Sequence, residues 1–246
     1  MKSFGLTDKG AVRKDNQDCF ILEKCEPKGC LIAALCDGMG GAKAGGIASQ
    51  LANKAFVSYI YTKLTSRLPR NVDYQRILEN ACAEANGVSF EYSHFDQDFD
   101  GMGTTIVGGV IKNNGSGYII NVGDSRAYLI RGQKLTQLTR DHSVVAELVE
   151  RGELTPEQAL HHPNRNLITR AVGVEDAVES DFFSLHLRRG DRLLLCSDGL
   201  SNTLSEEELI TLAHAGRSAS KACHALVDRA LDKGARDNVS AAIAII

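Results

Sequence analysis

The pattern of apolar and polar positions divides the chain into alternating blocks of strand and helix. Short apolar runs bounded by Gly, Asn and Asp are typical of strands, and the middle of the chain has four of them in succession, the pattern of a β-meander. Longer segments carry apolar residues at helical spacing. Strands are expected near residues 3–7, 19–25, 31–36, 104–111, 117–122, 126–130, 134–138, 181–187, 192–196 and 239–246, and helices near 44–64, 73–92, 143–151 and 218–231.

Local end signals support several of these helices. Gly152 follows the segment 143–151 as a suitable residue for the turn after a helix. Thr155 to Gln158 combine an N-cap, a proline at the first helical position and a capping-box glutamine. Ser205 and Glu208 form a second capping box, which predicts another short helix. Because strands and helices come in blocks, the pattern favours an α+β fold, with antiparallel sheets stacked in a sandwich and helices outside.

Composition narrows the class of protein. The chain has 246 residues, 24% of them charged and 43% hydrophobic, and a net charge of −3, which is ordinary for a globular protein. This charge gives no basis for binding nucleic acid or an anionic membrane. No apolar stretch approaches the roughly 20 residues of a membrane span, and no signal peptide is expected. Seven cysteines without a CxxC pair indicate neither disulfides nor a zinc ribbon, which favours a cytoplasmic location.

Three aspartates stand next to predicted strands. Asp37 and Asp198 each follow an apolar run and precede a glycine, and Asp237 precedes the final run. In antiparallel neighbours the end of one strand lies beside the start of the next, so these carboxylates could meet at one sheet edge. A cluster of this kind repels itself unless a cation neutralises it. An Asp-Gly turn explains any one of these positions equally well, and only the set of three favours a metal.

The donor types point to Mg²⁺ or Mn²⁺, because the ligands are hard oxygens without a neighbouring His/Cys cluster. Gly38 has no Cβ, so its backbone can approach a ligand and its carbonyl can act as one. Asp124, between two predicted strands, is a further candidate ligand, although a hairpin turn also explains it. Arg13 offers a guanidinium fork for phosphate oxygens. Two ions roughly 3.5–4 Å apart would polarise a phosphoryl group and activate a water for in-line attack, so no side-chain nucleophile is needed.

Taken together, these residues resemble the metal-dependent serine/threonine protein phosphatases of type 2C (the PPM family) in their compact bacterial form. The resemblance covers essentially the whole chain in the family's order. The matching segments are Thr7-Asp8-Lys9-Gly10, Arg13, Asn16-Gln17-Asp18, Cys36-Asp37-Gly38-Met39-Gly40-Gly41, Gly101-Met102-Gly103-Thr104-Thr105, Val122-Gly123-Asp124-Ser125-Arg126-Ala127-Tyr128, Ser197-Asp198-Gly199-Leu200 and Arg236-Asp237-Asn238-Val239-Ser240.

The resemblance implies a fold and a set of metal ligands. The fold would be a four-layer α-β-β-α sandwich, two central and mainly antiparallel sheets flanked by helices, in a single catalytic domain over residues 1–246. Asp37 would bridge two metal ions, with the Gly38 carbonyl on one of them. Asp198 and Asp237 would bind the other ion, and Asp124 with Asp198 would hold a third, weaker one.

The resemblance also implies the reaction and the partners. A water or hydroxide bridging the metal ions would attack the phosphorus of phosphoserine or phosphothreonine on proteins. Arg13 would bind the phosphate and Asp18 would orient metal-bound water. Residues from about 142 to 173 would form a flap, in which His161, His162 and Arg165 could contact the phosphopeptide, unless they are simply exposed loop residues. The partners would be proteins phosphorylated by a Ser/Thr kinase, and the kinase itself; nothing demands more than a monomer.

Two positions depart from the animal members of the family. Gln17 stands where they have an acidic residue, so it cannot supply an anionic ligand and Asp18 carries more of that role. Met39 stands where they have a histidine thought to protonate the leaving group, and a thioether cannot donate a proton. The general acid is therefore open: it would be metal-bound water or a flap residue.

Two other classes of function compete with a phosphatase. A non-catalytic phosphoprotein-binding relative would normally have lost metal ligands, yet all four ligand aspartates are present. A two-carboxylate glycosidase needs one carboxylic acid with a raised pKa beside a second carboxylate. Several aspartates with a glycine carbonyl suit a metal better, and the chain has no tryptophan to stack on a sugar.

Overall fold

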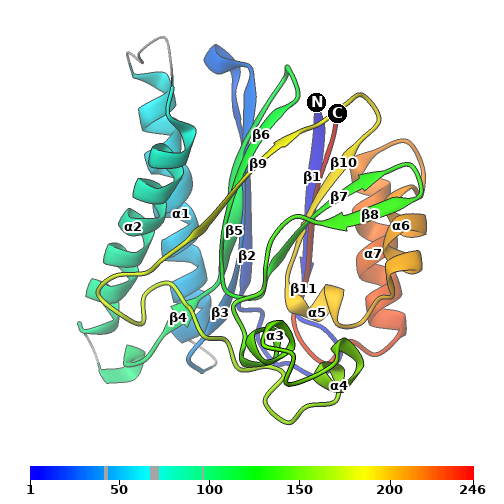
Figure 1. Cartoon of the computed structure of the whole chain (residues 1–246). Helices are drawn as coiled ribbons and strands as arrows, with labels where there is room; N and C mark the ends of the chain where they lie inside the picture. The colour runs from blue at the N-terminus through cyan, green and yellow to red at the C-terminus, as the bar shows by residue number, and fades with distance from the viewer. Residues whose placement is uncertain (42–43, 67–71, 96) are drawn as a thin grey trace.

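Two stacked antiparallel sheets form the centre of the protein in the computed structural model, which describes residues 1–246 except 42–43, 67–71 and 96 (Figure 1). The first sheet has the strand order β1-β11-β10-β7-β8, and the second has β2-β3-β5-β6-β9 with β4 paired to the end of β3. The strands are β1 (Lys2–Asp8), β2 (Asp18–Cys25), β3 (Cys30–Met39), β4 (Gly103–Thr104), β5 (Ile106–Lys112), β6 (Ser116–Val122), β7 (Arg126–Arg131), β8 (Lys134–Gln137), β9 (Asp181–His186), β10 (Arg192–Cys196) and β11 (Val239–Ile245).

Helices cover the outer face of each sheet. Helices α1 and α2 lie against the second sheet, and α6 and α7 lie against the first, while α3, α4 and α5 lie at one end of the sandwich (Figure 1). Their bounds are α1 (Ala44–Thr65), α2 (Tyr74–Ser93), α3 (Val144–Glu150), α4 (Pro156–Leu160), α5 (Asp198–Ser201), α6 (Glu206–Ala213) and α7 (Ala219–Asp232), with 3₁₀ turns at Glu26–Lys28 and Gln97–Phe99.

Apolar side chains fill the three spaces between the four layers. Phe56 and Ile60 of α1 belong to the cluster on the second sheet, and Leu226 of α7 belongs to the cluster on the first. Leu35 and Leu195 lie in the cluster between the two sheets. Each large side chain that is fully buried contributes about 1.5–3 kcal/mol relative to an exposed one. The expected α+β fold with four layers is confirmed.

The expected β-meander is wrong. The strands β5 and β6 pair in the second sheet, but β7 pairs with β10 and β8 in the first sheet. The chain crosses between the sheets at residues 123–125. Gly123 has a φ of 96°, and a Cβ there would lie 2.5 Å from Cγ2 of Thr105, so a glycine is required at the crossing. Hydrophobic spacing predicted each strand but carries no information on which sheet receives it.

The local signals at the helix ends are confirmed. Thr155 and Ser205 are N-caps with complete capping boxes, and Gly152 follows α3 with a φ of 73°. All seven cysteines are free, and Cys36 and Cys196 are fully buried, as expected of small apolar side chains. In the part of the chain that the structure describes, every helix is too short or too polar to cross a membrane.

Candidate active site

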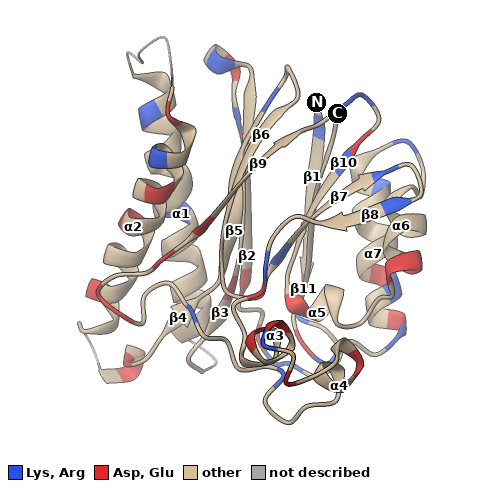
Figure 2. Cartoon of the chain, viewed as in Figure 1, with Lys and Arg blue, Asp and Glu red and all other residues tan. Residues whose placement is uncertain are grey.

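Five aspartates converge at the end of the sandwich that carries α3 and α5. In Figure 2, positions of acidic residues are marked on several elements at this end. Asp18 and Asp37 are direct partners across β2 and β3 of the second sheet. Asp198 is the first residue of α5, which follows β10, and Asp237 lies shortly before β11. The strands β10 and β11 both belong to the first sheet. Asp124 lies in the crossing between β6 and β7. The expectation of a single sheet edge is therefore wrong: two sheets contribute carboxylates at the same end.

The backbone of Asp37 is fixed by two threonines. Thr105 donates its N–H to the Asp37 carbonyl at 2.8 Å, and the Asp37 N–H donates to Thr105 Oγ1 at 2.9 Å. Thr104 Oγ1 also donates to the Asp37 carbonyl, at 2.8 Å. Because β3 continues to Met39 and pairs there with β4, Asp37 lies inside the strand instead of ending it. These bonds hold its backbone, and its carboxylate lies beside that of Asp198.

Gly38 is enclosed by backbone on both sides. A Cβ at this position would lie 2.0 Å from the Gly45 carbonyl oxygen and 2.9 Å from that of Gln17. Gln17 itself donates from Nε2 to the Gly41 carbonyl at 2.5 Å. Gln17, which stands where the animal members of the family have an acidic residue, thus ties the glycine-rich loop after β3 to the N-terminal loop.

Two serines that the sequence reading did not single out hold Asp18. Ser197 Oγ and Ser240 Oγ both lie within hydrogen-bond distance of Asp18 Oδ2, at 2.7 and 2.6 Å. Both serines belong to the first sheet or its border, so these bonds cross between the sheets. Burial raises the pKa of Asp18 to about 7 although the serine hydroxyls act in the opposite direction. The sequence feature that could have indicated these two serines is their position, because each lies next to a predicted metal-ligand motif.

Burial also raises the pKa of the neighbouring carboxyls. It raises that of Asp37 well above the ordinary value, with Asp18 and Asp198 adding repulsion. The pKa of Asp124 rises to about 7, and that of Asp198 is raised, again first by burial. Carboxylates collected out of water in this way require a counter-charge to ionise together.

The donors present fit a hard divalent cation. Asp18 Oδ1 and Asp198 Oδ1 are buried without a hydrogen-bond partner, which is costly for a carboxylate unless a cation or water binds it. All candidate ligands are oxygens, the type that Mg²⁺ and Mn²⁺ prefer. Among the described residues, however, no three His, Cys, Asp or Glu side chains form a ready-made metal cluster. The site therefore fits a divalent cation in the chemical type of its donors and in its buried oxygens without hydrogen-bond partners.

Arg13 lies at the rim of this cluster on a loop organised by Asn238. Asn238 accepts the Gln17 N–H at 2.8 Å and donates from Nδ2 to the carbonyls of Lys9 and Asp15, each at 3.0 Å. Arg13 Nη2 donates to Asp237 Oδ2 at 2.7 Å, and this contact is the main reason that the pKa of Arg13 is raised. The Arg13 side chain is 52% exposed, so its guanidinium remains accessible from solvent.

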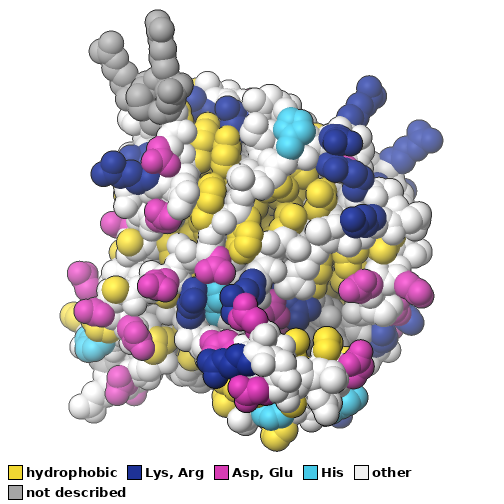
Figure 3. Space-filling view, in the orientation of Figure 1, with side chains coloured by type: hydrophobic (Ala, Val, Ile, Leu, Met, Phe, Trp, Pro, Cys, Tyr) yellow, Lys and Arg dark blue, Asp and Glu magenta, His cyan; other side chains and the backbone are white. Residues whose placement is uncertain are grey.

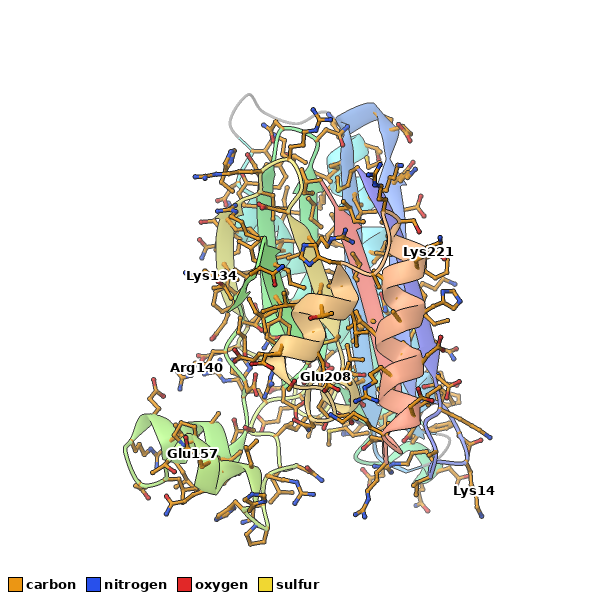
Figure 4. The ribbon with its side chains drawn as sticks, turned by 90° about the vertical axis from the view of Figure 1, so that its right-hand side faces the viewer. Lys14, Lys134, Arg140, Glu157, Glu208 and Lys221 are labelled. Carbon is orange, nitrogen blue, oxygen red and sulfur yellow. The ribbon has the colours of Figure 1, made fainter. Side chains whose placement is uncertain are left out.

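Several cavities border the carboxylates. One of about 600 Å³ is lined by Arg13, Asp37 and Met39, among others, and a second of about 710 Å³ extends beneath the flap. They share Asp124 and Asp198. In Figure 3, charged and histidine side chains gather on this face below an apolar area. Figure 4 shows Lys14 of the N-terminal loop and Glu157 of the flap on opposite sides of the same end.

The residues of the flap that were predicted to contact substrate differ in their position relative to the cavities. Arg165 lines the larger cavity together with Leu160 of α4, which is 66% exposed. His161 is exposed at the C-terminal end of α4 and is absent from the lining of both cavities. A contact of His161 with substrate stays a prediction, and the geometry favours Arg165 for that role.

Comparison with known proteins places this geometry in a family. Residues 9–239 match the family model described as protein phosphatase 2C. The serine/threonine phosphatase stp of Listeria monocytogenes is 37% identical over 235 residues, which is 95% of this chain and 91% of that protein. The structure of serine/threonine phosphatase Stp1 from Staphylococcus aureus is 34% identical, with a TM-score of 0.91 over 100% of this chain and 95% of that one.

A further solved structure bears on the metal. The catalytic domain of the serine/threonine protein phosphatase PstP, in complex with two manganese ions, is 33% identical with a TM-score of 0.85, covering 99% of this chain and 97% of that one. The family match spans nearly the whole sequence, and the Listeria relative is matched over 91% of its length. The chain therefore belongs to the protein phosphatase 2C family.

Proposed function

We propose that this protein is a metal-dependent phosphatase that hydrolyses phosphoserine and phosphothreonine on proteins. The observation that carries the proposal is the meeting of five aspartates from two sheets, with buried carboxylate oxygens left unpartnered, in a chain of the protein phosphatase 2C family. The relatives named as serine/threonine phosphatases support the same reaction.

The metal would be Mn²⁺ or Mg²⁺. The site would bind two ions, and the remaining carboxylate ligands would allow a third. Asp37 would bind both of the first two ions. The Gly38 carbonyl would bind one of them, and Asp198 and Asp237 would bind the other. Asp124 together with Asp198 would hold the third ion. When bound, such ions neutralise phosphate charge and lower the pKa of water enough for attack on phosphorus near neutral pH. Manganese in the PstP structure supports this assignment.

The chain's own side chains bind the substrate and orient water. Arg13 offers two parallel N–H donors to the phosphate, which competes with Asp237 for the guanidinium. Asp18 is held by Ser197 and Ser240 through Oδ2, which leaves Oδ1 to accept a hydrogen bond from water. Met39 lines the cavity but cannot protonate the leaving group, so that proton comes from water or from the flap.

The peptide around the phosphorylated residue would occupy the cavity beneath the flap. This cavity starts at Asp124 and Asp198, and its walls include the apolar side chains of Val149 and Leu160 beside Arg165. A phosphoryl group at the carboxylates brings neighbouring residues of an extended peptide into it at about 3.3 Å per residue. Residues 142–173 would thus recognise sequence, while the carboxylates perform the chemistry.

The wider role follows the family. The protein would act as a monomer in the cytoplasm and reverse phosphorylation by a Ser/Thr kinase, with the kinase itself among its substrates. Its net charge of −3 gives no support to nucleic-acid or membrane binding.

Hydrolysis of p-nitrophenyl phosphate and of phosphoserine and phosphothreonine peptides tests the proposal. We expect EDTA to abolish both reactions and Mn²⁺ or Mg²⁺ to restore them, with a phosphotyrosine peptide as the control for substrate class. A purified, folded protein that binds a phosphopeptide without hydrolysing it in Mn²⁺ would instead be a non-catalytic binding module. Activity that survives EDTA and dialysis would contradict the metal assignment.

A further inference from the structure

The base of the flap is a short pair of backbone segments joined by hydrogen bonds. The chain enters the flap after β8 at His142 and returns at Thr169, whose N–H donates to the His142 carbonyl at 2.9 Å. Next to it, the Val144 N–H donates to the Leu167 carbonyl, also at 2.9 Å. The segments where the chain enters and leaves the flap, here called its two roots, therefore meet at His142.

The same residue is bonded to the crossing that carries Asp124. The His142 N–H donates to the Gly123 carbonyl at 2.9 Å, and the Gly123 N–H donates to Nδ1 of the His142 ring at 3.2 Å. The His142 side chain is only 4% exposed. Asn121 Nδ2 adds a bond to the Gly123 carbonyl at 3.0 Å and another to the Arg140 carbonyl at 2.9 Å. Gly123 immediately precedes Asp124, so the crossing and the flap base share one network.

The other ring nitrogen is bonded to the second sheet. Because Nδ1 accepts from Gly123, the neutral ring carries its proton on Nε2, which lies 3.2 Å from Asp181 Oδ2 at the start of β9. Arg170, next to the returning root, donates to Asp181 Oδ1 at 3.1 Å. Burial lowers the pKa of His142, which favours the neutral ring. A buried imidazole with both nitrogens engaged has one defined orientation.

The crossing itself has little freedom to adjust. Gly123 has a left-handed φ of 96° and packs against Thr105, and Thr105 Oγ1 is hydrogen-bonded to Ser125 Oγ at 2.7 Å. A displacement of His142 would therefore be passed toward Asp124 through a segment that is packed and hydrogen-bonded on both sides. The same displacement reaches the flap through the bond between Thr169 and His142.

We propose that His142 is a positioning residue that locks the Asp124 crossing to both roots of the flap, so that Asp124 and the flap shift together. The proposal rests on the proposed function in assigning a metal to Asp124 and substrate to the flap. By linkage, an ion at Asp124 would order the flap to the same extent that a peptide on the flap would favour the ion.

Three substitutions separate the bonds of the ring. His142→Asn places Oδ1 where Nδ1 was, so it keeps the acceptor for Gly123 but not the donor to Asp181. His142→Gln places an amide N–H near the former Nε2, so it keeps the donor and loses the acceptor. His142→Ala removes both. His214→Asn is the control, because the His214 ring at the C-terminal end of α6 is hydrogen-bonded through Nδ1 to the Ile210 carbonyl of the same helix.

Amide hydrogen exchange on the metal-free protein is the first readout, because it does not depend on activity. For His142→Ala we expect faster exchange in both residues 121–125 and the flap. His142→Asn should keep the protection of residues 121–125 and lose it in the flap, because Asp181, which also binds Arg170 of the flap, loses the ring N–H. His142→Gln should do the reverse. His214→Asn should match the wild type in both segments.

Metal binding and kinetics give the second readout. By calorimetry with Mn²⁺, His142→Ala and His142→Gln should weaken the most weakly bound ion by about tenfold, as expected for a group that orients a metal ligand, while His142→Asn stays near the wild type. His142→Asn should instead mainly raise KM for a phosphopeptide, with kcat for p-nitrophenyl phosphate retained.

The outcomes distinguish the possibilities. If His142→Asn and His142→Gln behave alike in both segments, the lock is wrong; this comparison also decides the matter if His142→Ala does not fold. If the crossing and the flap exchange independently in His142→Ala, the coupling is wrong. A wild type without Mn²⁺-dependent hydrolysis would defeat the proposed function, whereas the exchange pattern would still test the lock.

Discussion

The acidic cleft and the flap beside it lie at the same end of the molecule but are held by different means. Asp18 and Asp37 belong to strands packed in the core, and Asp18 is bonded to serines more than 170 positions away in the sequence. Helices α3 and α4 of the flap have no buried residues among them. The cleft therefore has the stability of the whole fold, whereas the two helices of the flap contribute no buried residue to the core. Under the proposed function, the chemistry would lie on the part that is packed in the core and the recognition of the peptide on the flap.

The largest expected effect comes from removing a ligand charge in the rigid cleft. Asp37→Asn should lower kcat by at least about a hundredfold, since several kcal/mol of charge stabilisation depend on the metal. The melting temperature of the metal-free variant should not fall, because one member of a self-repelling cluster has been neutralised. Asp228→Asn, at an exposed position of α7, is the control. Full activity of Asp37→Asn with Mn²⁺ would contradict the assignment.

The next effect concerns substrate binding at the rim. Arg13→Ala should raise KM for a phosphopeptide about tenfold, because a charge-assisted hydrogen bond contributes about 1.5–3 kcal/mol. Steady-state kinetics measure the change, and Arg13→Lys should recover only part of the affinity because it lacks the planar fork. An unchanged KM in Arg13→Ala would remove the phosphate role and leave Arg13 as a partner of Asp237.

A smaller effect is expected in the flap, and only for peptides. Leu160→Ser should raise KM about fivefold for a phosphopeptide with apolar neighbours, corresponding to ~1 kcal/mol of lost apolar contact. Hydrolysis of p-nitrophenyl phosphate should not change, because this substrate has no neighbouring peptide residues to contact Leu160. Phe95→Ser is the control, since Phe95 is 86% exposed and outside the lining of that cavity. Equal losses for both substrates would show that the flap acts on the cleft itself.

The smallest effect lies at the opposite end, where a carboxylate is paired with a cation. Arg131 donates to Asp191 at 2.6 and 2.9 Å, and this bonding lowers the pKa of Asp191. A carboxyl whose pKa falls on folding adds stability above its unfolded pKa and loses it as pH falls toward the folded value. The melting temperature of the wild type should therefore exceed that of Asp191→Asn at about pH 6, and the difference should shrink below about pH 4. A difference that grows with acid would contradict the sign.

Local patterns predicted most of the elements, but they did not predict the partners of each strand. The bounds of α1, α2 and the capped helices follow from spacing and end residues, which act within a few positions. The β-meander failed because the turn at Gly123 sends β7 into the other sheet. Asp37 proved to be inside β3 because β4, more than 60 residues later, extends the pairing.

The candidate site divides in the same way. The aspartates, Gly38 and Arg13 could be named from their motifs because metal and phosphate chemistry requires particular residue types. Ser197, Ser240 and Asn238 could not be given roles, because serine and asparagine are common in turns and their function here is a hydrogen bond to a distant segment. His142 is a similar case, since its partners Gly123, Thr169 and Asp181 lie in separate parts of the chain.

By itself, the sequence determined the strands and helices, the oxygen donors and the family resemblance, since each is carried by residue type and short-range spacing. Only the tertiary structure decided that two sheets share the carboxylates, that serines span the gap to Asp18, and that His142 joins the flap to the Asp124 crossing. The physical reason is the distance along the sequence over which each kind of interaction acts. Periodicity and capping act over a few residues, whereas buried polar groups find their partners wherever folding brings a donor and an acceptor together.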